Sequence, residues 1–284
     1  MKRMTGLLVL EVRDSNPNGD PDRESRPRTR EDGKGEISPV SIKRKLRDLV
    51  EDKNGPVWAE FSKEFPADEF HILESRARNR DQIVEELKNG GELFVKKYWD
   101  ARLFGNTFLE KDKEDRIRSG AVQFGVGVSI SPVNIKEHTF TNKAGVEKDK
   151  DRGMAPLAFK VVEHGIYAAP FFVNPSAASK SGCTERDVEL MLRLLPFVYT
   201  HSRSMVRSQV EVLAAHTFLH TNPLGSVSDL RFIDALTPKK KEDSGAPSLS
   251  SADYVFPTFE VVKNDFEGRG TYKNLALLLS LIHI

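Results

Sequence analysis

The sequence predicts an α+β fold, formed as one large domain or as one domain with long insertions over residues 1–284. Strand-like apolar runs and amphipathic helical segments interleave along the chain, and long polar excursions separate them. No internal repeat stands out. With 38% hydrophobic and 30% charged residues, the composition is that of a globular protein that can bury a substantial core.

The first predicted elements are a strand, a turn and a basic helix. Residues 6–12 are apolar and strand-like, whereas residues 16–22 (NPNGDPD) contain too many turn formers to continue a strand. Ser38 is placed as the N-cap of a helix that has Pro39 at its first position. The apolar stripe of this helix consists of Ile42, Leu46, Leu49 and Val50.

The middle of the chain predicts an insertion, a helix and a long hairpin. Residues 51–91 form the insertion, with a helical, charge-mixed section, and residues 92–103 form a second amphipathic helix. Residues 120–130 predict a sheet strand whose glycines indicate close backbone approach or a bulge. Within residues 134–162, two strand-like arms flank the charged segment 143–152, which indicates a hairpin with a mobile tip.

The remaining elements follow in the same way. The second hairpin arm covers 155–162, and further strands are predicted over 165–173 and 210–219. Thr184 is the expected cap of a helix that reaches about residue 199. Residues 238–251 are polar and predict a flexible loop, disordered at its centre.

Cysteine content and hydropathy favour a cytoplasmic protein. The only cysteine, Cys183, excludes an intramolecular disulfide and fits a reducing compartment. No signal peptide is predicted, and the apolar residues 275–284 fall short of the roughly 20 residues that a transmembrane helix needs, so we expect no membrane partner. Cys183 precedes a predicted helix, which can lower the pKa of a thiol, but no adjacent base points to nucleophilic catalysis.

The opening turn also has part of a calcium-loop pattern. Oxygen-bearing side chains alternate, with glycine at the sixth position, in Asp14, Asn16, Asn18 and Gly19. Ser25, however, occupies the twelfth position, where such a loop needs a bidentate glutamate. The preceding segment is also a strand rather than a helix, so calcium binding is not expected.

No enzyme motif is found elsewhere in the sequence. His216 and His220 have a zinc-type spacing, but Thr217 stands where a zinc protease has glutamate, and the surrounding residues predict a strand. A glycine-rich phosphate loop of the Walker type is not present in the sequence. We therefore expect no metal, no cofactor and no catalytic residue.

Positive charge is concentrated beside the opening turn although the whole chain has a net charge of only +1. Residues 23–47 contain nine Lys or Arg against four acids. A second basic group follows the 184–199 helix, where Arg203 and Arg207 flank small and hydroxyl residues. Such groups bind phosphates with little regard to sequence and with strong salt dependence. A purely structural turn and a solvated helix face remain open as alternatives.

These segments resemble the Cas-seven family of the RAMP superfamily, the backbone subunit of type I CRISPR surveillance complexes (Cascade), closest to its I-C and I-B branch. Beyond the NPNGDPD turn and the basic helix, four segments follow in the family's order: residues 100–105 (DARLFG), 118–124 (RSGAVQF), 152–154 (RGM) with 162–167 (VEHGIY), and 201–207 (HSRSMVR). Family members often carry glycine where this chain has Ser208, and the resemblance supports nothing from Pro238 onward.

The resemblance implies a single right-hand-shaped domain. It has an RRM-like (ferredoxin-like) palm, a fingers insertion at about 51–91 and a β-hairpin thumb at about 134–162. Several copies line up along the spacer part of the CRISPR RNA (crRNA) and present it for pairing with target DNA. The implied partners are crRNA, target DNA, other copies of this chain and Cascade subunits of the Cas-five and large-subunit types.

The resemblance also implies a set of guide-binding residues. The crRNA-binding residues are expected to be Asn16, Asn18, Arg28, Ser41, Lys43, Arg44, Lys45, Arg47, Gln123, Met154, Arg203 and Arg207. In this family the lysines and arginines hold guide phosphates and the two asparagines shape the turn. Met154 would act as an apolar wedge beside a displaced base, while Gln123 would lie near the same path.

Two other functions stay open at this level. Related backbone subunits of type III complexes cut bound RNA with an aspartate and a metal, and the candidate aspartates here are Asp20, Asp22 and Asp149. The opening motif matches the type I branch instead, and no acid lies in a recognisable cutting context. A free RRM-like module is the third possibility, but the aromatic motifs with which such modules stack bases are missing from the sequence.

Overall fold

An antiparallel sheet forms the centre of the protein. The computed structural model describes residues 1–76, 80–88, 95–105, 119–142, 155–242, 245–258, 263 and 265–278. Its main sheet has the strand order β12-β9-β1-β8-β6-β4, with β5 and β7 pairing with other parts of β8. The strands of this sheet are β1 (Met4–Ser15), β4 (Lys34–Ile37), β5 (Val122–Phe124), β6 (Gly127–Pro132), β7 (Ile135–Asn142), β8 (Ala155–Val173), β9 (Val210–His220) and β12 (Gly270–Asn274). The predicted α+β class is confirmed.

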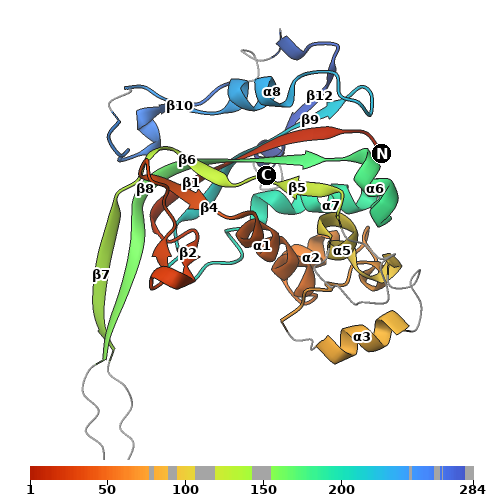
Figure 1. Cartoon of the computed structure of the whole chain (residues 1–284), viewed down its shortest axis with the longest axis horizontal. Helices are drawn as coiled ribbons and strands as arrows, with labels where there is room; N and C mark the ends of the chain where they lie inside the picture. Colours follow the sequence, from red (N-terminus) through yellow and green to blue (C-terminus); the bar gives the residue numbers. More distant parts are fainter. Residues whose placement is uncertain are drawn as a thin grey trace, which may run out of the picture.

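Helices cover both faces of the sheet (Figure 1). One face carries α1 (Pro39–Glu51), α2 (Pro56–Phe61), α5 (Trp99–Phe104), α6 (Pro175–Ser181) and α7 (Glu185–Leu194), and the other carries α8 (Asp229–Leu236). In β1, Leu8 and Leu10 belong to the larger core and Leu7 and Val9 to the smaller one. Burial on both sides explains why this strand is a continuous apolar run.

Short elements complete the chain. They are β2 (Gly19–Asp20), η1 (Pro21–Arg23), β3 (Arg26–Pro27), η2 (Ala67–Glu69), α3 (Arg80–Lys88), η3 (Leu195–Phe197), β10 (Lys239–Lys240), η4 (Ser251–Asp253), β11 (Tyr254–Val255) and η5 (Leu275–Leu278). The predicted insertion contributes α2, η2 and α3, and a small separate core forms around Leu73, Ile83 and Tyr98. Within the described ranges, no helix combines the length and apolar character needed to cross a membrane.

Helix α1 forms where local signals predicted it. Ser38 is the N-cap, and its Oγ accepts a hydrogen bond from the Ser41 N–H at 3.2 Å. Pro39 occupies the first turn, where its missing N–H costs nothing. The predicted apolar stripe is buried, with Ile42, Leu46 and Val50 fully enclosed. The helix therefore buries its apolar side in the core, and Lys45 and Arg47 are themselves only 5% exposed.

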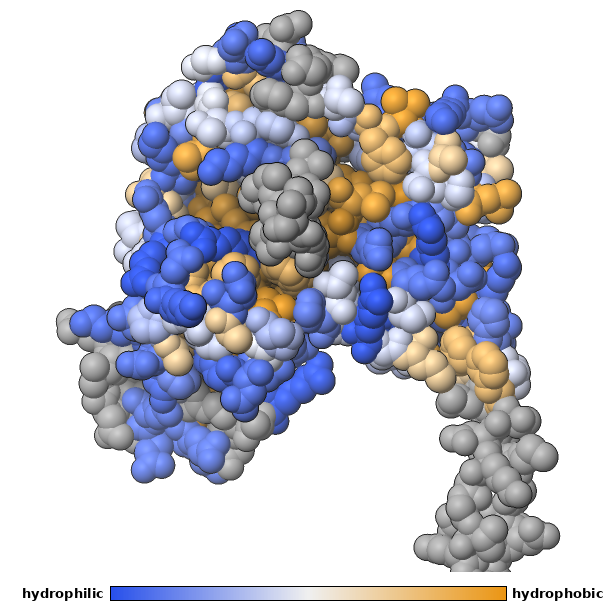
Figure 2. Space-filling view, turned by 180° about the vertical axis from the view of Figure 1, so that it is seen from behind, coloured by the Kyte–Doolittle hydropathy of each residue, from blue (hydrophilic) through white to orange (hydrophobic). Residues whose placement is uncertain are grey.

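The β7–β8 hairpin extends away from the body of the protein (Figures 1 and 2). Its arms pair from Ile135–Val162 out to Asn142–Ala155, as predicted. The sequence predicted separate strands over 155–162 and 165–173, and that division is wrong because β8 runs unbroken from Ala155 to Val173. Glycine at position 165 lets the strand continue beside the Tyr167 ring, because a Cβ at this position would lie only 2.9 Å from that ring. The predicted mobile tip, 143–152, lies outside the described residues.

Three further predictions need correction. The single strand over 120–130 is two strands, β5 and β6, because Gly125 and Val126 interrupt the pairing. The amphipathic helix predicted over 92–103 is interrupted at Tyr98, which forms a bridge with His71: residues 95–97 and α5 are helical on either side of it, and residues 92–94 lie outside the described residues. The predicted flexible loop 238–251 contains β10, which pairs with β11 in a separate two-stranded sheet, and Ser248, which is 2% exposed; the centre of the loop, residues 243–244, is not described.

Candidate nucleic-acid interface

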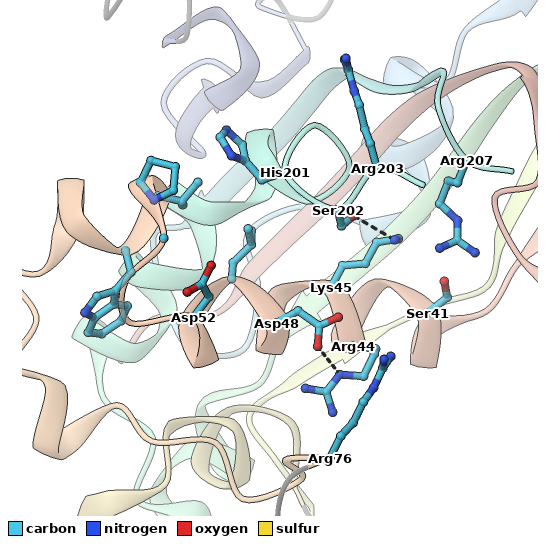
Figure 3. Close-up of a pocket in the computed structure, with 15 residues that line it drawn as sticks. Ser41, Arg44, Lys45, Asp48, Asp52, Arg76, His201, Ser202, Arg203 and Arg207 are labelled. Atoms are coloured by element: carbon cyan, nitrogen blue, oxygen red, sulfur yellow. Dashed lines mark hydrogen bonds and ion pairs between the residues drawn. The ribbon is translucent and has the colours of Figure 1, made fainter. Parts of the chain in front are cut away.

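A cationic cavity of about 620 Å³ lies between α1, the start of α2 and the loop 201–207 (Figure 3). Five basic side chains and two aspartates line it, namely Arg44, Lys45, Arg76, Arg203, Arg207, Asp48 and Asp52. Ser41, His201 and Ser202 add hydroxyl and imidazole groups. A cavity with this excess of positive charge attracts anions, and arginine and lysine bind phosphate as well as carboxylate groups through charge-assisted hydrogen bonds.

Lys45 is the most buried cation of the cavity. Only 5% of the residue is exposed, and its Nζ donates to the Ser202 hydroxyl at 3.0 Å while lying 4.8 Å from the centre of the Tyr199 ring. Burial lowers the pKa of Lys45 to about 8; nearby Arg207 also lowers it, and Asp48 acts in the opposite direction. In the described part of the chain no carboxylate lies within ion-pair distance of Lys45. A buried cation with only neutral partners is suited to receive an anionic ligand.

Arg207 and Arg203 enter the cavity from the loop before β9. The Arg207 Nε donates to the main-chain oxygen of Asn16 at 3.0 Å, and its own N–H closes a turn onto the Ser204 oxygen at 2.9 Å. Among the residues described, Arg207 forms no ion pair, so its positive charge is not neutralised locally. Arg203 is exposed and makes one long contact, 3.7 Å, with Glu211. Both arginines therefore keep hydrogen-bonding capacity for a ligand.

Arg44 lines the same cavity but is already committed to protein partners. Its Nε lies 2.8 Å from Asp48 and its Nη2 lies 3.2 Å from Glu51, while its Nη1 donates to the main-chain oxygen of Glu74. Both carboxylates neutralise the guanidinium. Arg44 thus orders α1 and its surroundings, and it contributes less free charge than Lys45 or Arg207.

The remaining two cations of α1 turn away from the cavity toward α5. Arg47 is 5% exposed, and its Nε lies 2.8 Å from Asp100, which is fully buried. Lys43 sits one turn earlier on the same side, 5.4 Å from the centre of the Phe104 ring, and burial lowers its pKa, with Arg47 adding to the effect. Neither residue lines the cavity. The four predicted guide-binding cations of α1 therefore separate into two pairs.

The two asparagines of the opening turn lie behind the cavity as supports. Asn18 Oδ1 accepts from the Ser38 N–H at 2.9 Å and from the Ser38 hydroxyl at 2.7 Å, which fixes the start of α1. Asn16 is 6% exposed and contacts both Arg207 and the hairpin. Arg28 donates its N–H to the Asn18 oxygen at 3.1 Å, and its guanidinium lies 3.4 Å from Asp20.

The last two predicted residues are not brought to the cavity by the described structure. Gln123 is exposed on β5 and donates to the Gly120 oxygen at 3.2 Å. Met154 lies outside the described residues. The sequence analysis in turn missed Arg76, Asp48 and Ser202 as lining residues. Ser202 is next to Arg203, yet only the fold brings its hydroxyl to Lys45, 157 positions away in the chain.

The family model for the CRISPR-associated protein Cas7 matches residues 2–258. The chain belongs to the Cas7 family. It is 26% identical over 220 residues to a CRISPR-associated protein Cas7 of Haloferax volcanii. That match covers 66% of this Cas7 chain and 62% of the relative, so it spans less than two thirds of the relative's length.

Two solved structures share the fold of this Cas7 chain. One is a chain of a CRISPR RNA-guided surveillance complex in a pre-nicking state, with a TM-score of 0.53 and 13% identity, covering 95% of this chain and 90% of that one. The other is a chain of a CRISPR RNA-guided surveillance complex, with a TM-score of 0.52 and 15% identity, covering 96% and 88%. At these identities the likeness establishes the architecture.

The titratable side chains considered from the sequence have other roles in this Cas7 chain. His216 Nδ1 bonds the Tyr272 hydroxyl at 2.8 Å, and His220 Nε2 bonds the Thr5 hydroxyl at 3.0 Å, so both are held by neighbouring elements. Burial raises the pKa of the Cys183 thiol, opposite to the lowering that a helix start would give. No cluster of three or more metal-binding side chains occurs among the residues described.

The lowered pKa of Lys45 predicts a pH dependence for anion binding by this Cas7 protein. Below pH 8 the ammonium is charged, and as pH rises through about 8 the free protein loses this charge. Above this pH, Lys45 must take up a proton before it can bind an anionic ligand as an ammonium group. Affinity for single-stranded RNA is therefore expected to fall about tenfold by pH 9. Fluorescence anisotropy from pH 6.5 to 9.5 measures this.

The matched control for the pH dependence is Lys45→Arg, whose guanidinium stays protonated throughout. Its affinity is expected to stay level where the wild type declines. The unfolded chain keeps the Lys45 proton up to about pH 10.4, so the wild-type free energy of unfolding should rise with pH between about 8 and 10.4. A wild-type affinity that does not change between pH 7 and 9 would contradict the assignment of Lys45 as an anion ligand.

Proposed function

We propose that this protein is a guide-RNA-binding backbone subunit of a type I CRISPR surveillance complex, in antiviral defence. The observation that carries the proposal is the cationic cavity, in which Lys45 and Arg207 have no carboxylate partner among the described residues. Membership of the Cas7 family and the fold shared with chains of two CRISPR RNA-guided surveillance complexes support the same function. The opening NPNGDPD turn favours the I-C or I-B branch.

The chemistry of the cavity suits a ribose-phosphate backbone. The cationic side chains bind phosphates and leave the bases free, and base pairing with the target then supplies sequence recognition. In this arrangement Lys45, Arg203 and Arg207 contact guide phosphates, Ser41 and Ser202 add hydroxyl contacts, and Asn18 holds α1 in place. Lys43 and Arg47 are left out of the contact set because they face α5.

The same proposal assigns the larger parts of the molecule. The main sheet with α1 is the palm, residues 51–91 are the fingers and the β7–β8 hairpin is the thumb. Further copies of this chain along the crRNA, subunits of the Cas-five and large-subunit types, and target DNA are the partners that complete the complex. In this proposal the protein acts in the cytoplasm.

Co-purification tests the function directly. The tagged protein is expressed in cells that carry a matching CRISPR array and the other Cascade genes, and nucleic acid in the purified complex is sequenced. We expect repeat-derived RNA of one defined size. Cells without the array are the control and should yield no such species. Purified complex without repeat-derived RNA would refute the proposal.

The non-catalytic part of the proposal has its own test. Asp20 Oδ1 accepts from the Asp22 N–H at 3.2 Å and lies 3.4 Å from Arg28, which is a turn-stabilising role; Asp149 lies outside the described residues. When the assembled complex is incubated with complementary RNA and magnesium, we expect intact RNA. Cleavage products at regular spacing would instead establish a type III-like nuclease.

A further inference from the structure

Asn16 connects two parts of the molecule that are far apart in the sequence, the β7–β8 hairpin and the cationic cavity. It follows directly after β1 and is 6% exposed. Its main chain faces the cavity loop: the N–H donates to the Val206 oxygen at 2.7 Å, and the carbonyl accepts from Arg207 Nε at 3.0 Å. The position of residue 16 therefore sets the position of the Arg207 guanidinium.

The side chain of Asn16 faces the opposite way, toward the hairpin. Its Nδ2 donates to the main-chain oxygen of Lys160 at 3.2 Å and to that of Ser25 at 2.6 Å. Lys160 belongs to the hairpin arm, where it pairs with Glu137. One residue thus bonds the root of the hairpin through its amide and the phosphate-binding arginine through its carbonyl.

A second contact between the turn and the hairpin lies beside the first. Glu24 Oε2 is 2.9 Å from Lys160 Nζ. Glu24 and Ser25 have φ values of 50° and 58°, a left-handed conformation that residues other than glycine rarely adopt. Such strain persists only where surrounding contacts impose it. The turn is therefore held against the hairpin by an ion pair and by the Asn16 amide together.

The Asn16 side chain also has an unfavourable feature that packing alone does not explain. Its Oδ1 is buried and has no hydrogen-bond partner among the described residues. A buried, unsatisfied oxygen destabilises the folded state. An apolar residue would avoid this penalty but would not bind the two carbonyl oxygens. The amide therefore lowers the stability of the folded state through its oxygen, while its two N–H groups connect the turn to the hairpin.

From these contacts we infer that Asn16 is a positioning residue that couples the orientation of the β7–β8 hairpin to the occupancy of the cationic cavity. A phosphate that draws Arg207 into place acts through the Asn16 main chain on the hairpin root. Ligand binding and hairpin orientation then share one free energy of coupling, and each favours the other. This inference rests on the proposed function for its ligand, single-stranded RNA, although the connection itself exists in the free protein.

The test uses Asn16→Leu, which approximately keeps the shape of the side chain, removes both donors and adds no charge. Hydrogen exchange is measured on the free protein. Exchange at residues 158–162 and 206–209 is expected to rise together, about tenfold, while thermal unfolding verifies that the variant is folded. Glu24→Gln is the matched control, because it removes only the Lys160 ion pair; its effect should stay within 158–162. An Asn16→Leu effect confined to one of the two segments would overturn the inference.

A second arm adds single-stranded oligouridine as the probe. In the wild type, RNA should protect residues 158–162, and in Asn16→Leu this protection should disappear. Affinity should fall about tenfold, because Arg207 is no longer held in place. An equal loss of affinity with the protection of residues 158–162 retained would instead make Asn16 a direct ligand and refute the positioning role. If wild-type protein binds no RNA, the proposed function fails, and the free-protein arm still decides whether the connection exists.

Discussion

Replacing Lys45 and Arg207 together with alanine should reduce affinity for single-stranded RNA by about 100-fold or more. Each residue is expected to make a charge-assisted hydrogen bond to phosphate, worth roughly 1.5–3 kcal/mol, and 1.4 kcal/mol corresponds to a tenfold change. Two fewer phosphate contacts should also reduce the slope of log affinity against log salt concentration by about 1.4. Titrations by fluorescence anisotropy at 50–300 mM NaCl measure both quantities.

The matched control for this prediction lies on the same helix. Lys43→Ala removes a positive charge two positions from Lys45, but Lys43 faces Phe104 and does not line the cavity. Its affinity should change only slightly, and its salt slope should stay within experimental error of the wild type. Equal losses in Lys43→Ala and in the double variant would mean that RNA binds to general surface charge, and the cavity would lose its assigned role.

Arg47→Ala should produce the largest loss of stability, about 3–5 kcal/mol in the free energy of unfolding. The Arg47 guanidinium and the Asp100 carboxylate are 6% and 0% exposed, so removing the arginine leaves a buried carboxylate without its counter-ion. Asp100 also accepts from the Leu73 N–H at 2.6 Å and the Glu74 N–H at 3.2 Å, so its charge helps fix the segment after η2. Urea denaturation at pH 7 measures the change.

Arg193→Ala provides the comparison for a solvent-exposed pair. Arg193 bridges Glu64 and Glu189, whose side chains are 59% and 50% exposed. Ion pairs of this kind contribute about 0–1 kcal/mol to the free energy of unfolding.

The RNA salt slope of Arg47→Ala, measured under conditions where that variant remains folded, should equal that of the wild type. A stable Arg47→Ala variant with a reduced salt slope would return Arg47 to the set of guide contacts.

Local signals were sufficient for the elements that frame the cavity. Ser38, Pro39 and the apolar stripe determine α1 because capping and helical spacing act within a few residues. The hairpin arms were predicted from the strand-like runs on either side of a charged segment. The continuity of β8 was missed because a glycine near the middle of an apolar run reads as an interruption, whereas here Gly165 makes room for the Tyr167 ring.

The assignment of the individual cations could not be obtained from the sequence. Lys43 and Arg47 lie one turn apart on α1, as expected. Residues that are distant in the sequence decide which side of the helix faces solvent. Arg47 forms an ion pair with Asp100, 53 positions away, and Lys45 donates a hydrogen bond to the Ser202 hydroxyl. These tertiary partners separate one run of positive charge into two pairs, of which only Arg44 and Lys45 line the cavity.

The unbroken β8 strand constrains how the hairpin can change length in evolution. Side chains alternate between the two faces of a strand, so adding one residue to the outer part of β8 would exchange the faces of every position beyond it. A longer or shorter arm that preserves both faces must gain or lose residues two at a time, with the same number in β7. Homologous hairpins should therefore differ in arm length by even numbers, and odd differences should coincide with a β-bulge.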